Sequence, residues 1–333
     1  MHQLSGLDAT FLYAEMNNSP MHIAPLLIYD PATTGRDVVR FKDILQTFAE
    51  RLDRSPVFRR KLAMVPLNLD QPYWVDDDRF DLEFHVRHIA LPKPGDWRQL
   101  SILAARLHAR PLDRARPLWE AYIIEGLDNV AGLPPGCYAM LLKVHHAAID
   151  GASGVELISA LHDFTATPPP PRPAAPPLLD SPPSQAEMLW RAYKANMKAP
   201  FRLARMVGQG IPAWRRVHEG VKAKKFRTLG DKERTRFNAA VSPHRVFGAA
   251  DFDLAVIRKA REAVPGATVN DAILSIVGGA LRQYLMDKKE LPAKSLVAGA
   301  PVNVRSRDEA KTGGNQVSMM TVPLGSDVAD PLE

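Results

Sequence analysis

A proline-rich run at residues 168–183 limits how this chain can fold. Nine of these sixteen positions are proline. Proline has no backbone N–H and a fixed φ, so such a run cannot enter a helix or a central strand and favours an extended spacer. We therefore expect two structured parts joined by a linker at 168–183. A proline-rich ligand for a partner domain is the alternative.

The segment before the linker has the pattern of a strand, a turn and a helix. Residues 138–144 form a mostly apolar run with a β-branched end, typical of a buried strand. Gly151 and Gly154 then permit a tight turn into a helix. Side chains alternate along a strand, so His145 and His146 should point to opposite sides, and only one can face a given cavity. The apolar residues of the helix recur at helical spacing: Val155, Ile158, Leu161 and Phe164.

A histidine at the end of a strand suits proton transfer. An unperturbed imidazole titrates near pH 7, so it can take a proton from an alcohol and return it to a leaving group. Two structural histidines, or a metal site, are the alternatives. No further cluster of His, Cys or Glu supplies a third and fourth ligand at the usual spacing, so we expect no bound metal.

The pattern His-His-x-x-x-Asp-Gly at residues 145–151 resembles the active-site signature of the coenzyme A-dependent acyltransferase superfamily. This superfamily includes chloramphenicol acetyltransferase and the condensation domains of peptide synthetases. The resemblance implies that His146 is the general base, that His145 supports it, and that Asp150 pairs with an arginine in a structural role. It also implies an α/β fold of the chloramphenicol acetyltransferase type, with mixed sheets flanked by helices and two halves separated by a cleft.

Other motifs narrow the resemblance to the bacterial wax ester synthase/diacylglycerol acyltransferase family. Condensation domains share the motif at 145–151 but are not expected to share the others in this order. Family members are longer than this chain, so the resemblance implies an incomplete C-terminal half, in either a fragment or a shortened member. The motifs are Leu4-Ser-x-x-Asp8, Pro20-Met-His22, Trp74-Val75, Phe80-Asp-Leu82, His85-Val-Arg-His88, Pro117-Leu-Trp119, Asn270-Asp271, Pro301-Val-x-Val-Arg305 and Gly314-Asn-Gln-Val-Ser318.

The family resemblance implies direct transfer of a long-chain acyl group from acyl-CoA to diacylglycerol or to a fatty alcohol. Acyl-CoA is then a substrate, with no bound cofactor, and His146 takes the hydroxyl proton. Asn270, at a helix start, is our candidate donor to the oxyanion, with simple helix capping as its alternative role. Arg305 is the arginine that we would pair with Asp150. Gly151 lets the turn approach the substrate path, or is merely a turn glycine.

Positive charge is concentrated between Met188 and Arg227, which holds eleven Lys/Arg and one acid. This local balance of +10 leaves −4 for the rest of a chain whose formal charge is +6. Aromatic and Met residues accompany the cations, so we expect helices, broken near Pro200 and Pro212, that bind an anionic membrane or lipid-droplet surface through residues 184–227. A packed helix pair with a solvated basic face is the alternative. Without a recognised nucleic-acid module, we expect no nucleic-acid partner.

The single cysteine, Cys137, excludes an intrachain disulfide and favours a reducing compartment. The first residues lack the basic start and apolar core of a secretory signal, and no uncharged apolar run approaches the length of a membrane span. We therefore expect a cytoplasmic protein, peripheral to membranes or lipid droplets. The expected segments are an N-terminal half at 1–167, the linker at 168–183, a basic helical segment at 184–227, and the start of a C-terminal half at 228–333.

Capping signals and apolar periodicity predict the helices. Ser5, with Asp8 three residues on, should cap a short helix, and Thr268 should cap another with Asp271 in its first turn. Apolar periodicity predicts helices at 38–52, 97–110 and 268–281.

Two stretches have strand patterns that matter below. Pro25 inside the stretch 22–29 argues for an edge position or a bulge. The alternation of apolar and polar residues predicts a strand over 82–89, in which His85 and His88 are half-buried.

Three rival functions share parts of this pattern. A condensation-type enzyme would keep His146 but depend on a carrier-bound acyl donor. A non-catalytic lipid-surface protein would use the basic segment and carry the histidine motif without turnover. A metal-dependent hydrolase would lose activity with chelators and contain stoichiometric metal.

Overall fold

The structure is a computed structural model that describes residues 2–16, 18–35, 39–149, 153–163, 165, 183–222, 235–303 and 317–330. The described residues fall into two compact units. Unit 1 takes those up to Ala199 together with Val241–Gly248, and unit 2 takes the others. The predicted linker, apart from Pro183, lies outside the described residues. The four-part division expected from the sequence stays a prediction.

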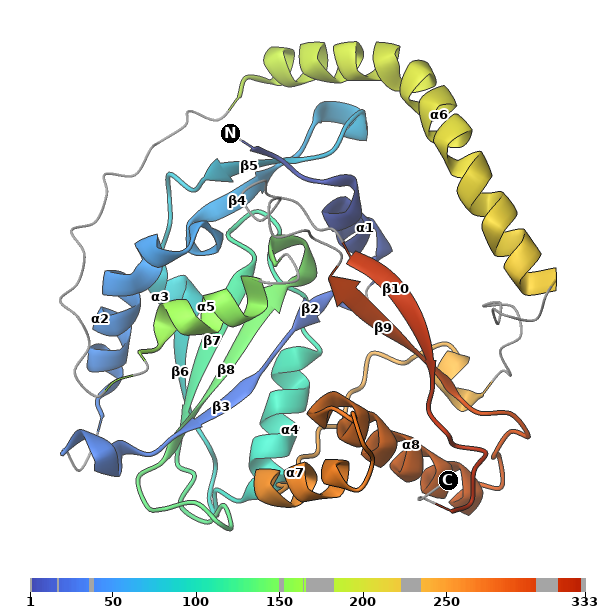
Figure 1. The fold of residues 1–333 in the computed structure, drawn as a ribbon. Helices are drawn as coiled ribbons and strands as arrows, with labels where there is room; N and C mark the ends of the chain where they lie inside the picture. Colours follow the sequence, from blue (N-terminus) through green and yellow to red (C-terminus); the bar gives the residue numbers. More distant parts are fainter. Residues whose placement is uncertain are drawn as a thin grey trace. The chain divides into compact units, whose positions relative to one another are not determined.

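Unit 1 is built on a five-stranded mixed sheet (Figure 1). Strands run in the order β2-β8-β7-β6, and β3 also pairs with β8. β6 and β7 are parallel, and the other pairs are antiparallel. Almost every residue of β7 and β8 is buried, as expected for central strands covered on both faces. The bounds are β2 His22–Ile23, β3 Leu26–Tyr29, β6 Val86–Ala90, β7 Trp119–Glu125 and β8 Tyr138–His145.

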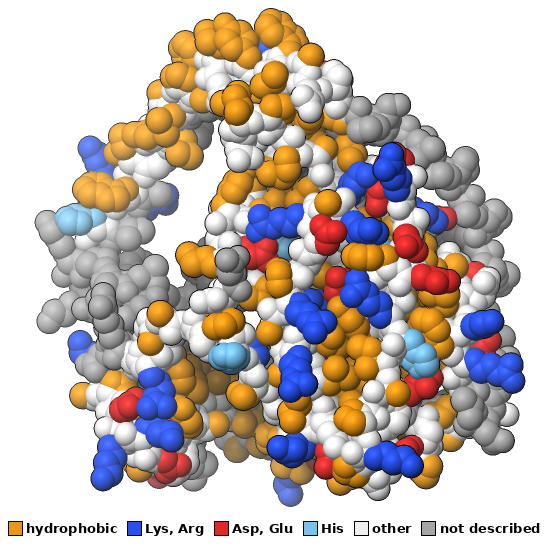
Figure 2. Space-filling view, turned by 180° about the vertical axis from the view of Figure 1, so that it is seen from behind, with side chains coloured by type: hydrophobic (Ala, Val, Ile, Leu, Met, Phe, Trp, Pro, Cys, Tyr) orange, Lys and Arg blue, Asp and Glu red, His pale blue; other side chains and the backbone are white. Residues whose placement is uncertain are grey.

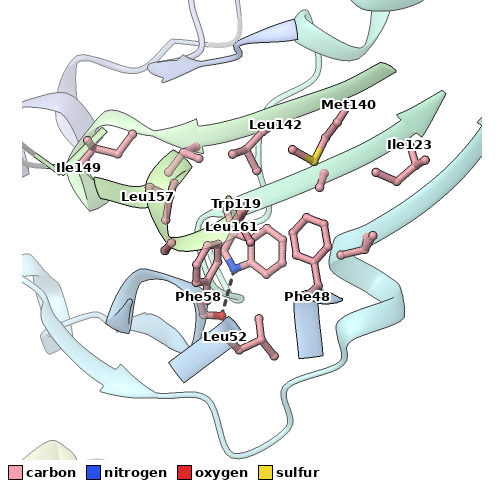
Figure 3. Packing of buried hydrophobic residues seen from close by; sticks show 14 residues of the cluster. Phe48, Leu52, Phe58, Trp119, Ile123, Met140, Leu142, Ile149, Leu157 and Leu161 are labelled. Carbon is pink, nitrogen blue, oxygen red and sulfur yellow. Dashed lines mark hydrogen bonds between the residues drawn. The ribbon is translucent and has the colours of Figure 1, made fainter. Parts of the chain in front are cut away.

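Helices cover both faces of this sheet. α2 (Phe41–Arg51) and α5 (Ser153–Leu161) pack on one face in a cluster that includes Leu142, and α4 (Trp97–His108) packs on the other. Trp119 is completely buried in the first cluster, and its Nε1–H donates to the Phe58 carbonyl at 3.0 Å (Figure 3). A buried indole N–H therefore has its partner, and the core around β7 keeps one arrangement.

A smaller sheet and one helix complete the packing around the end of β8. β1 (His2–Gln3), β5 (Tyr73–Asp76) and β4 (Arg60–Ala63) form the three-stranded sheet. Ser5 is the N-cap of α1 (Gly6–Ala14), and its side chain accepts from the Asp8 amide, so the predicted cap is confirmed. Buried residues of this helix pack with others from β4, from the start of β7 and from the turn after β8: Ala9, Leu12, Leu62, Leu118 and Ala147.

The predicted strand over 82–89 is wrong in its first half. Residues Leu82–His85 form the short helix α3, because the Asp81 side chain accepts from the amides of Glu83 and Phe84. Alternating apolar residues fit one helical turn as well as a strand, and the cap decides between them. His85 is fully buried and not half-buried, and His88 lies exposed on β6.

The proline in stretch 22–29 behaves as its position predicts. It separates β2 from β3, and both strands lie on the same outer side of β8. Its carbonyl accepts from the Leu142 amide at 3.1 Å, and the register against β8 is the same on both sides of it, so the proline interrupts an edge strand without a bulge.

Unit 2 includes, among its elements, helices α7 and α8 and a pair of strands. α7 (Leu254–Glu262) and α8 (Val269–Asp287) precede β9 (Val297–Asn303), which pairs antiparallel with β10 (Val317–Pro323). Thr268 and Asp271 form a complete capping box at the start of α8, which confirms the predicted N-cap. The chain also has short 3₁₀ helices at Pro31–Thr34, Leu52–Arg54, Pro56–Phe58, Pro66–Asn68, His146–Ala148 and Arg236–Asn238.

The described part of the basic segment forms one long helix, α6 (Gln185–Lys222), which passes through Pro200 and Pro212. The predicted breaks are therefore wrong, because each proline removes a single backbone hydrogen bond while the turns on both sides keep theirs. Met188 and Ala192, near its start, are buried against Val65 and Tyr73 in unit 1. Across the described residues, no helix combines the length and the apolar composition that a membrane crossing requires.

Candidate active site

Three neighbouring segments hold the histidine pair. β8 ends at His145, and His146 begins the 3₁₀ turn His146–Ala148. The amide of His145 donates to the Leu118 carbonyl at 3.0 Å, and the amide of His146 donates to the Met21 carbonyl at 2.9 Å. The backbone that carries both imidazoles is thus tied to the start of β7 and to the residue before β2.

The ring of His145 supports the turn and does not face solvent. Its Nδ1 accepts from the Ala147 amide at 3.0 Å, so Nδ1 carries no proton. In the neutral ring the proton is then on Nε2, which lies 3.6 Å from a carboxylate oxygen of Glu15. This distance exceeds a direct hydrogen bond, so the contact is electrostatic. Burial lowers the pKa of His145, which keeps the ring neutral at pH 7.

The ring of His146 is half-buried and stacks on Phe11 of α1. Their ring centroids are 4.9 Å apart, with an angle of 18° between the planes. Burial lowers the pKa of His146 below its ordinary value. The neutral form, which can accept a proton, therefore dominates at neutral pH, and the stacking on Phe11 sets the plane of the ring.

The remaining predicted site residues divide into two groups. Asp150, Gly151 and Arg305 lie outside the described residues, so their roles stay predictions. Asn270 is the second residue of α8 in unit 2 and is exposed. Thr268 caps that helix, so capping is not the role that the structure gives Asn270. Its role as oxyanion donor stays a prediction.

Sequence reasoning did not find the charged groups around the histidines. Arg114 donates from Nε to a carboxylate oxygen of Glu15 at 3.0 Å, and from Nη2 to the Leu12 carbonyl at 2.8 Å. The Met21 amide donates to the other Glu15 oxygen at 3.2 Å. These residues are distant from residues 145–151 in the chain, and no spacing rule connects them. The resemblance of the segment 4–8 to a family motif was the one nearby signal.

A second group of buried polar side chains lies on the face of the sheet that α4 covers. The Lys143 ammonium is completely buried, donates to the Arg110 carbonyl at 2.7 Å, and lies 3.7 Å from Glu120. Burial lowers the pKa of Lys143. His22, which pairs with His145 across β2 and β8, has its pKa lowered to about 3 by burial and by the Lys143 charge. A neutral imidazole and a paired ammonium thus lie beside the end of β8.

The described side chains around the histidine pair do not form a set of metal ligands. Within the part of the chain that the structure describes, no three His, Cys, Asp or Glu side chains are grouped closely enough to hold one. The surroundings of His146 instead contain the buried imidazole of His145 and the ion pair of Glu15 with Arg114.

The sequence profile of the "Wax ester synthase/diacylglycerol acyltransferase catalytic domain" matches residues 4–273, which include the histidine motif. The chain belongs to this family. "Putative diacyglycerol O-acyltransferase Rv1760" of Mycobacterium tuberculosis is 33% identical over 338 residues, and the match covers all of this chain and 64% of that protein. "O-acyltransferase WSD" of Acinetobacter baylyi is 31% identical over 346 residues, covering all of this chain and 70% of that one.

Solved structures share the fold. The wax ester synthase/diacylglycerol acyltransferase from Marinobacter aquaeolei VT8 gives a TM-score of 0.63 at 26% identity, covering 98% of this chain and 67% of that chain. The first condensation domain of the calcium-dependent antibiotic synthetase gives 0.52 at 15% identity, covering 96% and 68%, and shows the fold alone. The family and the α/β fold class predicted from the sequence are therefore confirmed. This chain spans about two thirds of the length of the relatives that it matches.

Proposed function

We propose that this family member is an O-acyltransferase that moves a long-chain acyl group from acyl-CoA to diacylglycerol or to a fatty alcohol. The products are then a triacylglycerol or a wax ester. The observation that carries the proposal is the placement of His146, whose half-buried ring is packed on Phe11 and whose pKa is lowered by that burial. A base held in one direction in its proton-accepting form is what acyl transfer to an alcohol requires.

The reaction proceeds in one active site without an acyl-enzyme. His146 takes the hydroxyl proton while the acceptor oxygen attacks the thioester carbonyl. The tetrahedral intermediate then expels the thiolate of coenzyme A, and the imidazolium returns its proton to that sulfur. Charge and protons balance, and no bound cofactor takes part.

Three further residues have proposed roles. Asn270 donates an N–H to the oxyanion, supported by its place in the first turn of α8, where the helix dipole favours negative charge. Asp150 pairs with Arg305 and holds the loop after the histidines, and Gly151 leaves room for the substrate path. Acyl-CoA is a substrate that these residues meet and not a resident group.

The test is acceptor-dependent thiol release from palmitoyl-CoA, with a diacylglycerol or hexadecanol as acceptor. His146→Ala should lower the rate by about 10²- to 10⁴-fold, the usual contribution of a general base. His88→Ala is the matched control, because His88 is an exposed histidine on β6 whose Nε2 lies 2.9 Å from Glu125. That variant should keep the wild-type rate.

Other outcomes would overturn the proposal. A rate that is equal in His146→Ala and wild type removes the assigned base. Turnover only with a carrier-bound acyl donor indicates the condensation-type rival, and loss of turnover with a chelator indicates the metal hydrolase. If these 333 residues release no thiol with either acceptor, they do not suffice for the reaction.

We also propose that α6 docks on an anionic membrane or lipid-droplet surface. The exposed fractions of Trp190, Phe201 and Trp214 are 58%, 79% and 65%, so this helix leaves large apolar side chains in solvent. Figure 2 shows hydrophobic side chains gathered along it. Lys194 and Lys198 lie four positions apart on this helix, and the Lys194 ammonium lies 5.3 Å from the centre of the Trp190 ring, so cations border the apolar side chains. Such an amphipathic helix suits an anionic interface. Its other exposed apolar residues are Leu189, Tyr193, Met197, Leu203, Met206, Val207 and Ile211.

A charge-matched pair of variants tests this surface. Replacing Lys194, Lys198 and Arg205 by glutamine should weaken binding to phosphatidylglycerol vesicles about 10²-fold, at roughly 1 kcal/mol per cation. The control replaces the adjacent cations at 258, 259 and 261 on α7 by glutamine, which removes the same charge from an exposed helix. Equal loss in both variants would contradict a site on α6, because it would reflect net charge alone.

A further inference from the structure

Glu15 lies directly after the C-terminal end of α1, and its carboxylate is almost fully buried. Its side chain is 7% exposed. One oxygen accepts from the Met21 amide at 3.2 Å. The other accepts from both Nε and Nη2 of Arg114. This carboxylate therefore has its own counter-charge and a fixed orientation.

The same carboxylate contacts the ring of His145 and the Met21 peptide that holds the backbone of His146. Its Oε2 lies 3.6 Å from Nε2 of His145. Its Oε1 holds the Met21 amide, and the carbonyl of Met21 accepts from the His146 amide at 2.9 Å. One side chain thus faces the ring of His145 and anchors the peptide that fixes the backbone of His146.

The charge of Glu15 favours the same tautomer of His145 that the Ala147 amide requires. Burial acts to raise the pKa of Glu15, but the hydrogen bonds from Arg114 and Met21 outweigh it, and the net pKa lies below its usual range. An ionised carboxylate opposite Nε2 favours the proton on Nε2. Nδ1 is then free to accept from the Ala147 amide, which lies in the turn that begins at His146. The other tautomer would set two N–H groups against each other and break that turn.

We propose that Glu15 is a positioning residue for acyl transfer, acting through His145 and Met21 to fix the direction of the His146 ring. This inference rests on the proposed function of His146 as the base. Glu15 touches no reacting atom, so its effect is on geometry. A misplacement of about 1 Å at a reacting group costs about 10²-fold in rate.

The test compares Glu15→Gln with Glu15→Asp in the full chain. Glutamine removes the charge at nearly constant shape, so kcat should fall about 10²-fold while KM changes little. Aspartate keeps the charge, so it should restore part of kcat. The control is Glu290→Gln, which removes an exposed glutamate paired with Arg236 in unit 2 and should leave both constants unchanged.

A readout independent of turnover separates this inference from the proposed function. Spectra that correlate ¹⁵N and ¹H in histidine-labelled protein report the protonation and the surroundings of each ring. His145 should keep its proton on Nε2 in all three proteins, because the Ala147 amide still donates to Nδ1. The ring signals of His146 should be alike in the wild type and in Glu15→Asp, and should shift in Glu15→Gln. If the wild type shows no turnover but the His146 signals shift in this way, the proposed function fails while the effect of Glu15 on the His146 ring stands.

Two results would overturn the inference. The first is unchanged His146 ring signals in a folded Glu15→Gln protein. The second is a kcat that falls only in proportion to the folded fraction, measured by near-ultraviolet circular dichroism, which would leave Glu15 a purely structural role.

Discussion

Two adjacent glycines of α8 should respond in opposite ways to the same substitution. Gly278 is buried, and a Cβ added there would lie well inside 3.0 Å of the Leu324 carbonyl oxygen, 3.1 Å from its carbonyl carbon and 3.4 Å from its Cβ. Gly279 is exposed, and a Cβ there would meet no atom within 4 Å. Gly278→Ala should therefore destabilise unit 2, and Gly279→Ala should not.

The magnitude follows from two opposing terms. Alanine in a helix interior is better than glycine by up to about 1 kcal/mol, and this gain applies to both variants. Overpacking costs about 1–3 kcal/mol and applies to Gly278→Ala alone, because its neighbour is backbone and cannot rotate away. The Leu324 amide also donates to the Leu296 carbonyl at 2.9 Å, which ties that segment to the chain before β9. The two variants should thus differ by about 1–3 kcal/mol, with Gly278→Ala the less stable.

Urea unfolding of the full chain, followed by far-ultraviolet circular dichroism, measures this difference as a shift in midpoint at constant slope. The adjacent position is the control, since both variants add the same methyl group to the same helix. Equal midpoints, or a larger loss for Gly279→Ala, would refute the packing of α8 on the segment after β10.

Three further predictions follow from the buried groups of unit 1. Because burial lowers the pKa of His22 from 6.5 to about 3, the unfolded chain binds a proton in this window that the folded chain does not. The free energy of unfolding should therefore decrease as the pH falls below 6.5, by about 1.4 kcal/mol per pH unit from this residue. Urea unfolding between pH 7 and 5 measures this decrease, and a free energy of unfolding that stays constant over that range would contradict the prediction. Since burial also lowers the pKa of His146, the acid limb of kcat/KM should have its midpoint below 6.5, and a midpoint above that value contradicts the assignment. Trp119→Phe leaves the Phe58 carbonyl unpaired and should cost about 1–3 kcal/mol in thermal unfolding, whereas Trp190→Phe, at an exposed site, should cost almost nothing.

Local sequence was sufficient for the elements that depend on neighbours in the chain. The caps at Ser5 and Thr268, the strand 138–144 and the helix 97–110 all follow from spacing within one or two turns. The seven residues of the histidine motif, with the motifs before and after them, also indicated the family, because such patterns are short and ordered.

Two predictions failed where a local pattern had two solutions. The alternation at 82–89 fits a strand or a helical turn, and the Asp81 cap selected α3 there. Prolines at 200 and 212 can end or merely interrupt a helix, and α6 continued through both. In each case the sequence pattern is compatible with two local structures and does not distinguish them.

By itself, the sequence determined that the chain carries a histidine pair on a strand end and belongs to an acyltransferase family. Only the tertiary structure decided what surrounds that pair. Glu15, Arg114 and Phe11 come from segments distant in the chain, and they reach His145 and His146 because α1 and the segment before β7 pack against the end of β8. Contacts of this kind depend on which surfaces bury each other, and no residue spacing encodes them.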